Sequence, residues 1–279
     1  MAIPMPPNEL VYFGKPGSFT HIVAKQIVGS EKLVSRETVQ EVFDYVKQDK
    51  SRRGIVPIEN SSGGMILDTV DNLVAEDLDL KIQEEYAINV QLSLLGKKGA
   101  SIRKIYSHFA PFHHCDKWLK ENYPDAERVV VDSTSAAAQH AAHDKHAAAI
   151  APARTAPEYR LDVIHSGIAN DISNVTQFFL LGHAKSASKD IKETSLSVVL
   201  KNEVGSLCHF LKPFATESIN LKRIMSRPIV GQPNNYVFFV GIEASTNETP
   251  MKKAMEEARR HCTEIRLLGS YPVHPPFES

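Results

Sequence analysis

Four short segments bring hydroxyl, amide, carboxyl or glycine residues to the end or the beginning of a predicted strand. They are residues 14–20, 59–64, 132–134 and 174–178. In open α/β sheets, ligands bind beyond the carboxyl ends of strands, and the first turn of a helix offers free backbone N–H groups to an anion. The four segments therefore predict a cleft that binds a small carboxylate substrate.

Each segment also has a purely structural interpretation. The segments contain residue types that commonly cap a helix or close a turn, namely Ser18, Ser133, Thr134 and the pair formed by Asn60 and Ser61. Threonine, which opens the strand in the fourth segment, is a common strand residue. A glycine-bearing turn alone favours a plain strand-to-helix connection over an anion site. The pattern alone leaves both interpretations open.

A group of histidines in the middle of the chain shows no metal-ligand spacing such as HExxH. The group consists of His108, His113, His114, His140, His143 and His146. His113 and His114 are adjacent on a predicted helix, so their side chains point to different faces and cannot act as a ligand pair. Only His108, at a strand end, is a candidate for a site.

The elements that must position these segments alternate between strand and helix. Strands are predicted at residues 10–13, 54–58, 102–107, 128–132, 147–151 and 175–181, and helices at 18–28, 38–47, 65–74, 112–123 and 134–143. One or two further strands are expected between residues 80 and 95, where the chain crosses between lobes. This alternation predicts α/β layers with mostly parallel pairing.

A small, polar linker at residues 185–192 separates this region from a different pattern. The predicted order there is strand 195–200, helix 206–216, strands 221–224 and 236–242, helix 251–261 and strand 265–268. The order β-α-β-β-α-β is that of ferredoxin-like domains. We therefore expect a separate C-terminal domain of this fold.

Composition excludes several classes of protein. The chain has 279 residues and a formal net charge of -1, so bulk electrostatics favour neither nucleic acid nor an anionic membrane. It has no apolar run of the roughly 20 residues that a membrane span needs. Cys115, Cys208 and Cys262 form no CxxC pair, which indicates reduced thiols. The start of the chain lacks a basic and an apolar signal region, so a cytoplasmic location is expected.

Taken together, these segments resemble the prephenate dehydratase family, lyases of phenylalanine biosynthesis. The matching segments are GKPGSFT at 14–20, VPIENS at 56–61, Tyr106-Ser107-His108 followed by Cys115, and DSTSAA at 132–137. The C-terminal unit resembles the ACT regulatory domain of the same family at residues 205–207, 219–221, 226–228 and 268–272. The resemblance covers nearly the whole chain.

The resemblance implies an α/β dehydratase module at residues 8–183, with two lobes like a type II periplasmic binding protein, followed by an ACT domain at 194–273. Lobe one would comprise residues 8–80 and 155–183, and lobe two residues 81–154. The implied reaction removes carbon dioxide and water from prephenate to give phenylpyruvate, without a metal or organic cofactor. Self-association through ACT domains to a homodimer or homotetramer, with phenylalanine as effector, is also implied.

The resemblance assigns roles to individual residues. Thr176, Gln177 and Phe178 would be catalytic, with Thr176 as the proton donor or positioning group. The substrate-binding residues would be Ser18, Thr20, Asn60, Ser61, His108, Ser133, Thr134 and Asn174. The effector-binding residues would be Gly205, Ser206, Leu207, Asn220, Leu221, Ser226, Arg227 and Pro228.

This chain departs from the family pattern at polar positions. The family has arginine at Gln177, glutamine at Ala110, glutamate at Met225 and proline at Val204. Glutamine cannot form a charge-assisted bidentate pair with a carboxylate, and such bonds contribute about 1.5–3 kcal/mol. Either Lys15 or Arg154 is a candidate to replace that charge.

These departures keep alternative functions open. A prephenate decarboxylase would lose carbon dioxide without making an aromatic ring, an arogenate dehydratase would use the amino analogue, and a catalytically silent amino-acid sensor would turn over neither. Met225 replaces a carboxylate near the expected effector site, so a changed response to phenylalanine is expected.

Overall fold

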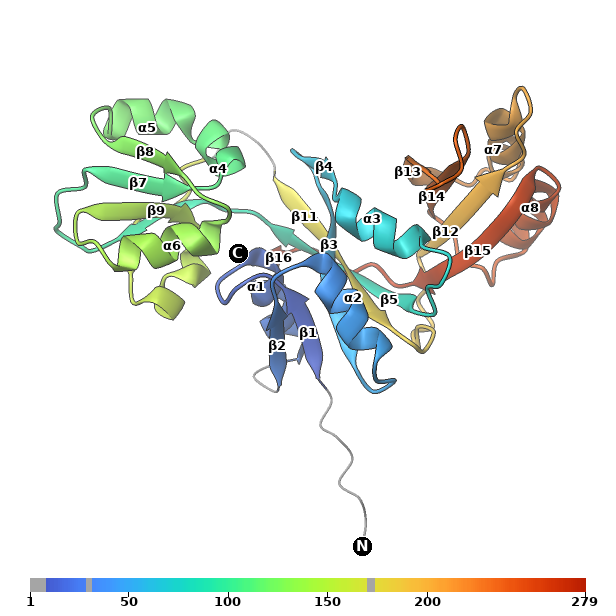
Figure 1. The fold of residues 1–279 in the computed structure, drawn as a ribbon, viewed down its shortest axis with the longest axis horizontal. Helices are drawn as coiled ribbons and strands as arrows, with labels where there is room; N and C mark the ends of the chain where they lie inside the picture. The colour runs from blue at the N-terminus through green and yellow to red at the C-terminus, as the bar shows by residue number, and fades with distance from the viewer. Residues whose placement is uncertain (1–8, 29–31, 170–173) are drawn as a thin grey trace, which may run out of the picture.

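The computed structural model describes residues 9–28, 32–169 and 174–279. The described residues form three β-sheets, each with its own helices. Figure 1 shows them side by side, with the first lobe between the second lobe and the C-terminal domain. Two lobes followed by a C-terminal domain were predicted, and the structure has one sheet for each of these parts.

The sheet of the first lobe has the strand order β16-β5-β11-β3-β1-β2, with β4 paired to β3. Its strands are β1 (Leu10–Phe13), β2 (Leu33–Arg36), β3 (Arg53–Asn60), β4 (Gly64–Met65), β5 (Lys81–Asn89), β11 (Val175–Gly182) and β16 (Phe277–Glu278). Helices α2 (Val39–Lys47) and α3 (Leu67–Val74) pack on one face, and α1 (Phe19–Val28) packs on the other. Buried apolar residues at helical spacing, such as Val39, Val42, Phe43 and Val46 of α2, explain this packing.

The sheet of the second lobe has the order β10-β6-β9-β7-β8. Its strands are β6 (Ser93–Gly96), β7 (Lys104–Ser107), β8 (Glu127–Val130), β9 (Ala147–Ala151) and β10 (Asp162–His165), and its helices are α4 (Phe109–His114), α5 (Asp116–Asn122) and α6 (Thr134–Ala142). Two short 3-10 turns, Ala153–Thr155 and Pro157–Tyr159, follow β9. The helix expected at 112–123 is thus two helices that meet at Cys115.

The predicted lobe boundaries are wrong at both crossings. Strand β5 belongs to the first lobe because it pairs with β11 and buries Tyr86 and Ile88 in that core. Strand β10, which was expected in the first lobe, pairs with β6 of the second. The chain therefore crosses after β5 and returns after β10.

Mostly parallel pairing was predicted, but it holds for only part of each sheet. Strand β1 pairs in parallel with β2 and β3, and β7 with β8 and β9. Strand β11 is antiparallel to both β3 and β5, and β6 is antiparallel to both β9 and β10. The antiparallel strands flank the two crossings, where the chain changes lobe instead of returning over a helix.

The C-terminal sheet has the fully antiparallel order β13-β14-β12-β15. Its elements are β12 (Glu193–Leu200), α7 (Ser206–Thr216), β13 (Leu221–Pro228), β14 (Tyr236–Ile242), α8 (Thr249–Arg259) and β15 (Cys262–Tyr271). Both helices pack on one face through Phe210, Phe214 and Met251. The predicted ferredoxin-like order is confirmed.

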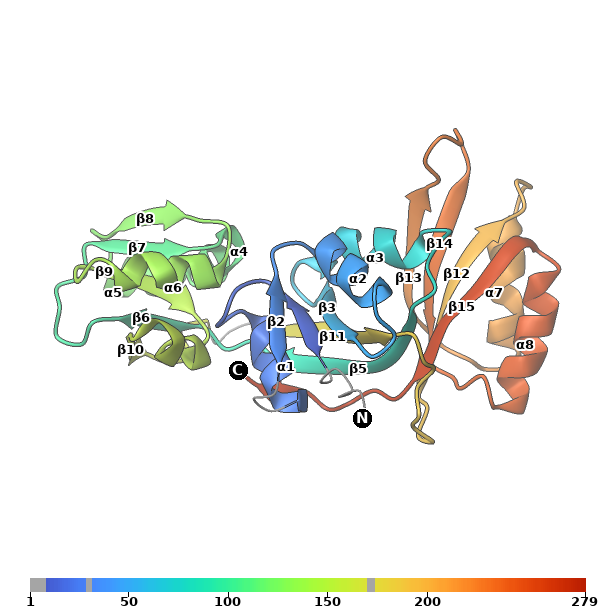
Figure 2. The ribbon, with the colours of Figure 1, turned by 60° about the horizontal axis from the view of Figure 1, so that its bottom comes forward.

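The other face of this sheet packs on the first lobe, so that Phe239 and Tyr271 share one core with Val56 and Phe179. The last residues then run back along the first lobe, and β16 pairs with β5 (Figure 2). This return was not predicted, because a two-residue strand has no detectable periodicity. Among the helices of the described residues, none is long and apolar enough to cross a membrane.

Candidate active site

A cavity of about 460 Å³ lies between the two lobes. It is lined by Phe13, Gly14, Lys15, Ser18, Phe19, Thr20, Glu37, Pro57, Asp132, Ser133, Thr134, Ser135, Ala136, Thr176 and Phe178. Three of the four segments singled out in the sequence therefore meet here, although tens to more than a hundred residues separate them along the chain. The fourth segment, residues 59–64, contacts the cavity lining through a hydrogen bond from Asn60 to Thr176.

The first turns of two helices line the cavity from opposite lobes. Ser18 Oγ accepts a hydrogen bond from the His21 backbone N–H at 3.2 Å, and Ser133 Oγ accepts one from Ala136 N–H at 3.0 Å. Neither α1 nor α6 carries an acidic residue in its first turn. The cap and anion-site interpretations are thus compatible, because each helix N-terminus retains a partial positive charge toward the cavity.

Asn60 holds the hydroxyl of Thr176 at the floor of the cavity. The Asn60 Oδ1 atom accepts from the backbone N–H groups of Ser62 at 3.0 Å and Gly63 at 2.9 Å, which fixes the orientation of the amide. Its Nδ2 therefore donates to Thr176 Oγ1 at 2.9 Å and to Asn174 Oδ1 at 2.6 Å. Since Thr176 accepts from an amide, its own proton is left to point to another acceptor.

The glycine turn before α1 is held by three residues that sequence reasoning missed, His21, Thr155 and Tyr159. Gly17, at φ +82°, donates its N–H to His21 Nδ1 at 2.8 Å, and its carbonyl accepts from Thr155 Oγ1 at 2.7 Å. A Cβ atom at position 17 would lie 2.7 Å from Thr155 Cγ2, so only glycine fits. Tyr159 adds a bond from its hydroxyl to the Pro16 carbonyl at 2.8 Å. In the sequence, the only sign of this arrangement is His21, which lies about one helical turn after Gly17.

His21 is buried beside the cavity and must stay neutral to hold this turn. Its Nδ1 accepts from Gly17 and so carries a lone pair. Burial, together with the charge of Lys25, lowers the pKa of His21 below its ordinary value. The turn is therefore sensitive to acid.

Charged side chains at the cavity are few. Lys15 lines it together with Glu37 and Asp132, whereas Arg154 is exposed and does not. Of the two residues considered to replace a missing arginine charge, only Lys15 lies at the cavity. Backbone N–H groups and hydroxyls supply most of its polarity.

Gln177, which the sequence analysis placed in the catalytic group, does not line the cavity. Thr176 and Phe178 line the cavity, but Gln177 points to the opposite face of β11 because side chains alternate along a strand. There its Nε2 donates to Glu85 Oε1 at 3.1 Å. Gln177 is thus a residue of the junction between the first lobe and the C-terminal domain.

Four predicted substrate-binding residues, Asn60, Ser61, His108 and Asn174, do not line the cavity. His108 is exposed and caps α4, with its Nδ1 accepting from Ala110 N–H at 3.4 Å. The Ser61 hydroxyl accepts from the Val175 N–H at 3.0 Å and so holds β3 to β11. Asn174 contacts Asn60, as described above. Cys115 is fully buried, and burial raises the pKa of its thiol to about 12, which makes it no nucleophile.

The predicted effector residues lie at separate places in one chain. Gly205, Ser206 and Leu207 line a cavity at the N-terminus of α7. Asn220 lies at the opposite end of the sheet, where its Nδ2 donates to Glu243 at 2.7 Å. Arg227 donates to both carboxylate oxygens of Asp71 in α3. A single chain therefore does not bring these residues together.

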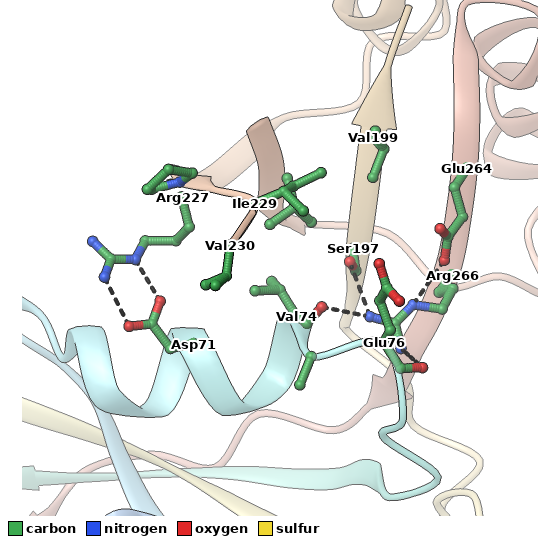
Figure 3. A pocket seen from close by; sticks show the side chains of 13 residues that line it. Asp71, Val74, Glu76, Ser197, Val199, Arg227, Ile229, Val230, Glu264 and Arg266 are labelled. Carbon is green, nitrogen blue, oxygen red and sulfur yellow. Dashed lines mark hydrogen bonds and ion pairs between the residues drawn. The ribbon is translucent and has the colours of Figure 1, made fainter. Parts of the chain in front are cut away.

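Figure 3 shows a second cavity, of about 480 Å³, between α3 and the C-terminal sheet. Its charged side chains already have partners: Arg227 pairs with Asp71, and Arg266 donates to the Val74 carbonyl at 2.7 Å. Among the described residues, none of those predicted to be catalytic or to bind substrate lines it. The candidate active site is therefore the cavity between the lobes.

The fold and the cavity define a two-lobed α/β protein with a polar cleft and a C-terminal ferredoxin-like domain. Residues 10–186 match the family model described as prephenate dehydratase. The prephenate dehydratase of Lactococcus lactis subsp. cremoris is 32% identical over 95% of this chain and 98% of its own length. The chain therefore belongs to the prephenate dehydratase family, a family of hydro-lyases.

Solved structures support the same fold. The prephenate dehydratase from Arthrobacter aurescens, in complex with L-Phe, has a TM-score of 0.86 at 26% identity, covering 95% of this chain and 90% of its own. A structure described as a quorum quenching acylase also reaches 0.86, at 22% identity over 95% of this chain and 98% of its own. The similarity to the acylase structure, at 22% identity, shows the fold alone. Because proteins described by different activities share this fold, the fold by itself does not identify the reaction.

Proposed function

We propose that this chain is a prephenate dehydratase, which converts prephenate to phenylpyruvate with loss of carbon dioxide and water. The observation that carries the proposal is the Asn60–Thr176 hydrogen bond at a cavity lined by two helix N-termini. This site offers an oriented hydroxyl for a leaving group and two positions for carboxylates. Prephenate carries both kinds of group.

The proposed binding uses one lobe for each carboxylate. The first turns of α1 and α6 present N–H groups and the hydroxyls of Ser18, Thr20 and Thr134. Lys15 adds a full positive charge on the side of the first lobe. Binding would hold the lobes together, which positions the ring over Thr176 and excludes water.

In the proposed reaction, the bond from the ring to its carboxylate breaks and carbon dioxide leaves. The electron pair of that bond enters the ring, which becomes aromatic as the bond to the ring hydroxyl breaks. The departing hydroxide takes up one proton and becomes water. Thr176 donates a hydrogen bond to the leaving oxygen, where negative charge develops. Asn60 keeps that hydroxyl turned toward the ring.

The position of Gln177 favours dehydration over decarboxylation alone. The decarboxylase hypothesis rested on Gln177 and Ala110 as altered site residues. Gln177 faces Glu85 on the far side of β11, and Ala110 does not line the cavity. Neither residue is among the groups that line the cavity.

The test is an assay of the purified chain on prephenate and on arogenate, with products identified by ultraviolet absorbance and mass. Phenylpyruvate from prephenate is the expected product. A non-aromatic product that has lost only carbon dioxide would establish the decarboxylase instead. If arogenate gives phenylalanine and prephenate does not react, the chain is an arogenate dehydratase. An absence of turnover on both compounds would leave only the amino-acid sensor.

We further propose that the C-terminal domain is an ACT domain that binds phenylalanine at a self-association interface. Its ferredoxin-like order and the L-Phe named for the Arthrobacter aurescens structure support this. Strand β13 is an edge strand of the sheet, with Ile224 44% and neighbouring Tyr236 48% exposed. If two β13 strands pair antiparallel about a two-fold axis, the Asn220 end of one domain meets the Pro228 end of its partner.

Two measurements test the regulatory proposal. Light scattering at micromolar concentration should give a dimer or a tetramer, and a monodisperse monomer would contradict self-association. Titration calorimetry with phenylalanine should show binding that a variant with a charged edge, Ile224→Lys, loses together with the dimer. A cytoplasmic location also remains a proposal, in keeping with three free cysteines.

A further inference from the structure

A cluster of buried charges joins the first lobe to the C-terminal domain. Its members are Glu59 of β3, Glu85 of β5, Glu193 of β12, and Lys222 and Arg223 of β13. The side chains of Glu85 and Arg223 are each 1% exposed. Burying charges is costly unless they are paired and hydrogen-bonded, so this cluster is a built feature of the junction.

Arg223 is the centre of this cluster. Its Nη1 and Nη2 atoms donate to the two oxygens of Glu85 at 2.8 and 2.9 Å, which is a bidentate pair. Its Nε atom donates to Glu59 at 2.8 Å, and Nη1 also reaches Glu193 at 3.3 Å. The guanidinium lies 5.6 Å from the ring centroid of Phe179 on β11. One residue of the C-terminal domain thus contacts three strands of the first lobe.

These strands are the ones that carry the catalytic hydroxyl. On β3, Glu59 directly precedes Asn60, and on β11, Gln177 directly follows Thr176. The two strands pair Thr176 with Asn60 and Gln177 with Glu59. On the cavity face, Asn60 and Thr176 are hydrogen-bonded to each other. On the opposite face of the same strands, the neighbouring pair contacts the cluster: Gln177 donates to Glu85, and Glu59 accepts from Arg223.

Gln177 and Arg223 share one acceptor in this cluster. Three carboxylates face two cations in this cluster, and Gln177 Nε2 donates to the Glu85 oxygen that Arg223 Nη2 also contacts. Both side chains compete for one carboxylate, so a cation on β13 and a cation on β11 could serve the same pair of strands. This chain carries the cation on β13.

We propose that Arg223 is a positioning residue for Thr176, supplied by the C-terminal domain in place of a cation on β11. Resting on the proposed dehydratase function, the proposal gives the C-terminal domain a direct part in catalysis: its guanidinium fixes the backs of β3 and β11 so that Asn60 and Thr176 stay in hydrogen-bond register. Lys222 donates to Glu85 and Glu193 but not to Glu59. It therefore belongs to the same cluster but does not position Asn60 and Thr176.

The experiment compares Arg223→Gln, Lys222→Gln and the charge transfer Gln177→Arg/Arg223→Gln by kcat, KM and thermal unfolding. Arg223→Gln should lower kcat about 10- to 100-fold with little change in KM, because a misplaced group loses rate more than binding. Lys222→Gln should lower the unfolding temperature but leave kcat within about twofold. The double variant should recover most of the lost kcat, since the cation returns to Glu85 and Glu59 from β11.

Equal loss of kcat in Arg223→Gln and Lys222→Gln would overturn the proposal, as would a folded Arg223→Gln protein with full kcat. If Arg223→Gln fails to fold, the double variant decides: a folded but inactive double variant also overturns it. Amide hydrogen exchange at residues 56–61 and 175–179 provides a readout independent of turnover. It should increase in folded Arg223→Gln and not in Lys222→Gln, even if prephenate is not the substrate.

Discussion

The two faces of β11 use polarity in opposite ways. Toward the cavity, Thr176 is one neutral hydroxyl set by one amide, near helix N-termini and backbone N–H groups. Toward the C-terminal domain, Gln177 joins a cluster of full charges that exclude water. Preorganised dipoles stabilise charge that appears only during reaction, whereas permanent ion pairs fix geometry. Adjacent residues of one strand therefore divide chemistry and positioning between them.

The sharpest test of the cavity face is Thr176→Val. Valine has nearly the same shape, so the fold should survive, whereas loss of the hydroxyl should lower kcat by about 10²–10⁴-fold. Steady-state kinetics on prephenate, with circular dichroism as the control for folding, measure this. Activity within a few-fold of the parent would remove Thr176 from the mechanism.

On the opposite face, Glu85→Gln should act mainly on stability. It leaves the fully buried Arg223 without its bidentate partner, and breaking a buried pair in this way costs about 3–5 kcal/mol. Urea unfolding gives the free energy. Asp190→Asn, which removes an exposed pair with Lys192, is the matched control and should change it very little. Similar losses in both variants would mean that burial does not matter here.

A smaller effect on the cavity face is expected from the pH dependence of stability, because the glycine turn is held by His21. The folded pKa of His21 lies below its ordinary value of 6.5, so the unfolded chain binds the proton more readily. The contribution of neutral His21 to the free energy of unfolding is complete above pH 6.5. It is lost as pH falls from 6.5 through the lowered pKa, by at most about 1.4 kcal/mol per pH unit.

His21→Gln keeps an acceptor for Gly17 but does not titrate. Urea unfolding between pH 7.5 and 5.5 should therefore show a weaker loss of stability in this variant than in the parent protein. Identical slopes in the two proteins would show that the histidine does not carry this sensitivity.

The smallest effect is expected at the rim of the junction, for Asp71→Asn. The Arg227–Asp71 pair is partly exposed, with side chains 27% and 46% accessible, so its loss should change the free energy of unfolding by no more than about 1 kcal/mol. It should instead free Arg227, which the resemblance assigns to effector binding. Calorimetry should show a changed affinity for phenylalanine; an unchanged affinity would separate Arg227 from that site.

Local patterns in the sequence were sufficient for most elements. The limits of β1, β9, α7 and β14 agree with the prediction, because the strands are apolar runs between turn signals and α7 buries residues at helical spacing. The capping serines Ser18 and Ser133 also act as expected. The short strands β2, β4, β10 and β16 were missed because none of them is a continuous apolar run; each is defined by the strand with which it pairs.

The amino-acid sequence by itself determined the elements, the ferredoxin-like order and the family, and it identified Thr176 and Asn60 as residues of one site. Only the tertiary structure decided that Gln177 faces Glu85 and not the substrate, that β5 and β10 belong to the lobes they do, and that Arg223 reaches across a domain boundary. The physical reason is that periodicity records whether a side chain is buried. It does not record which of two buried environments, the cavity or the charged junction, receives it.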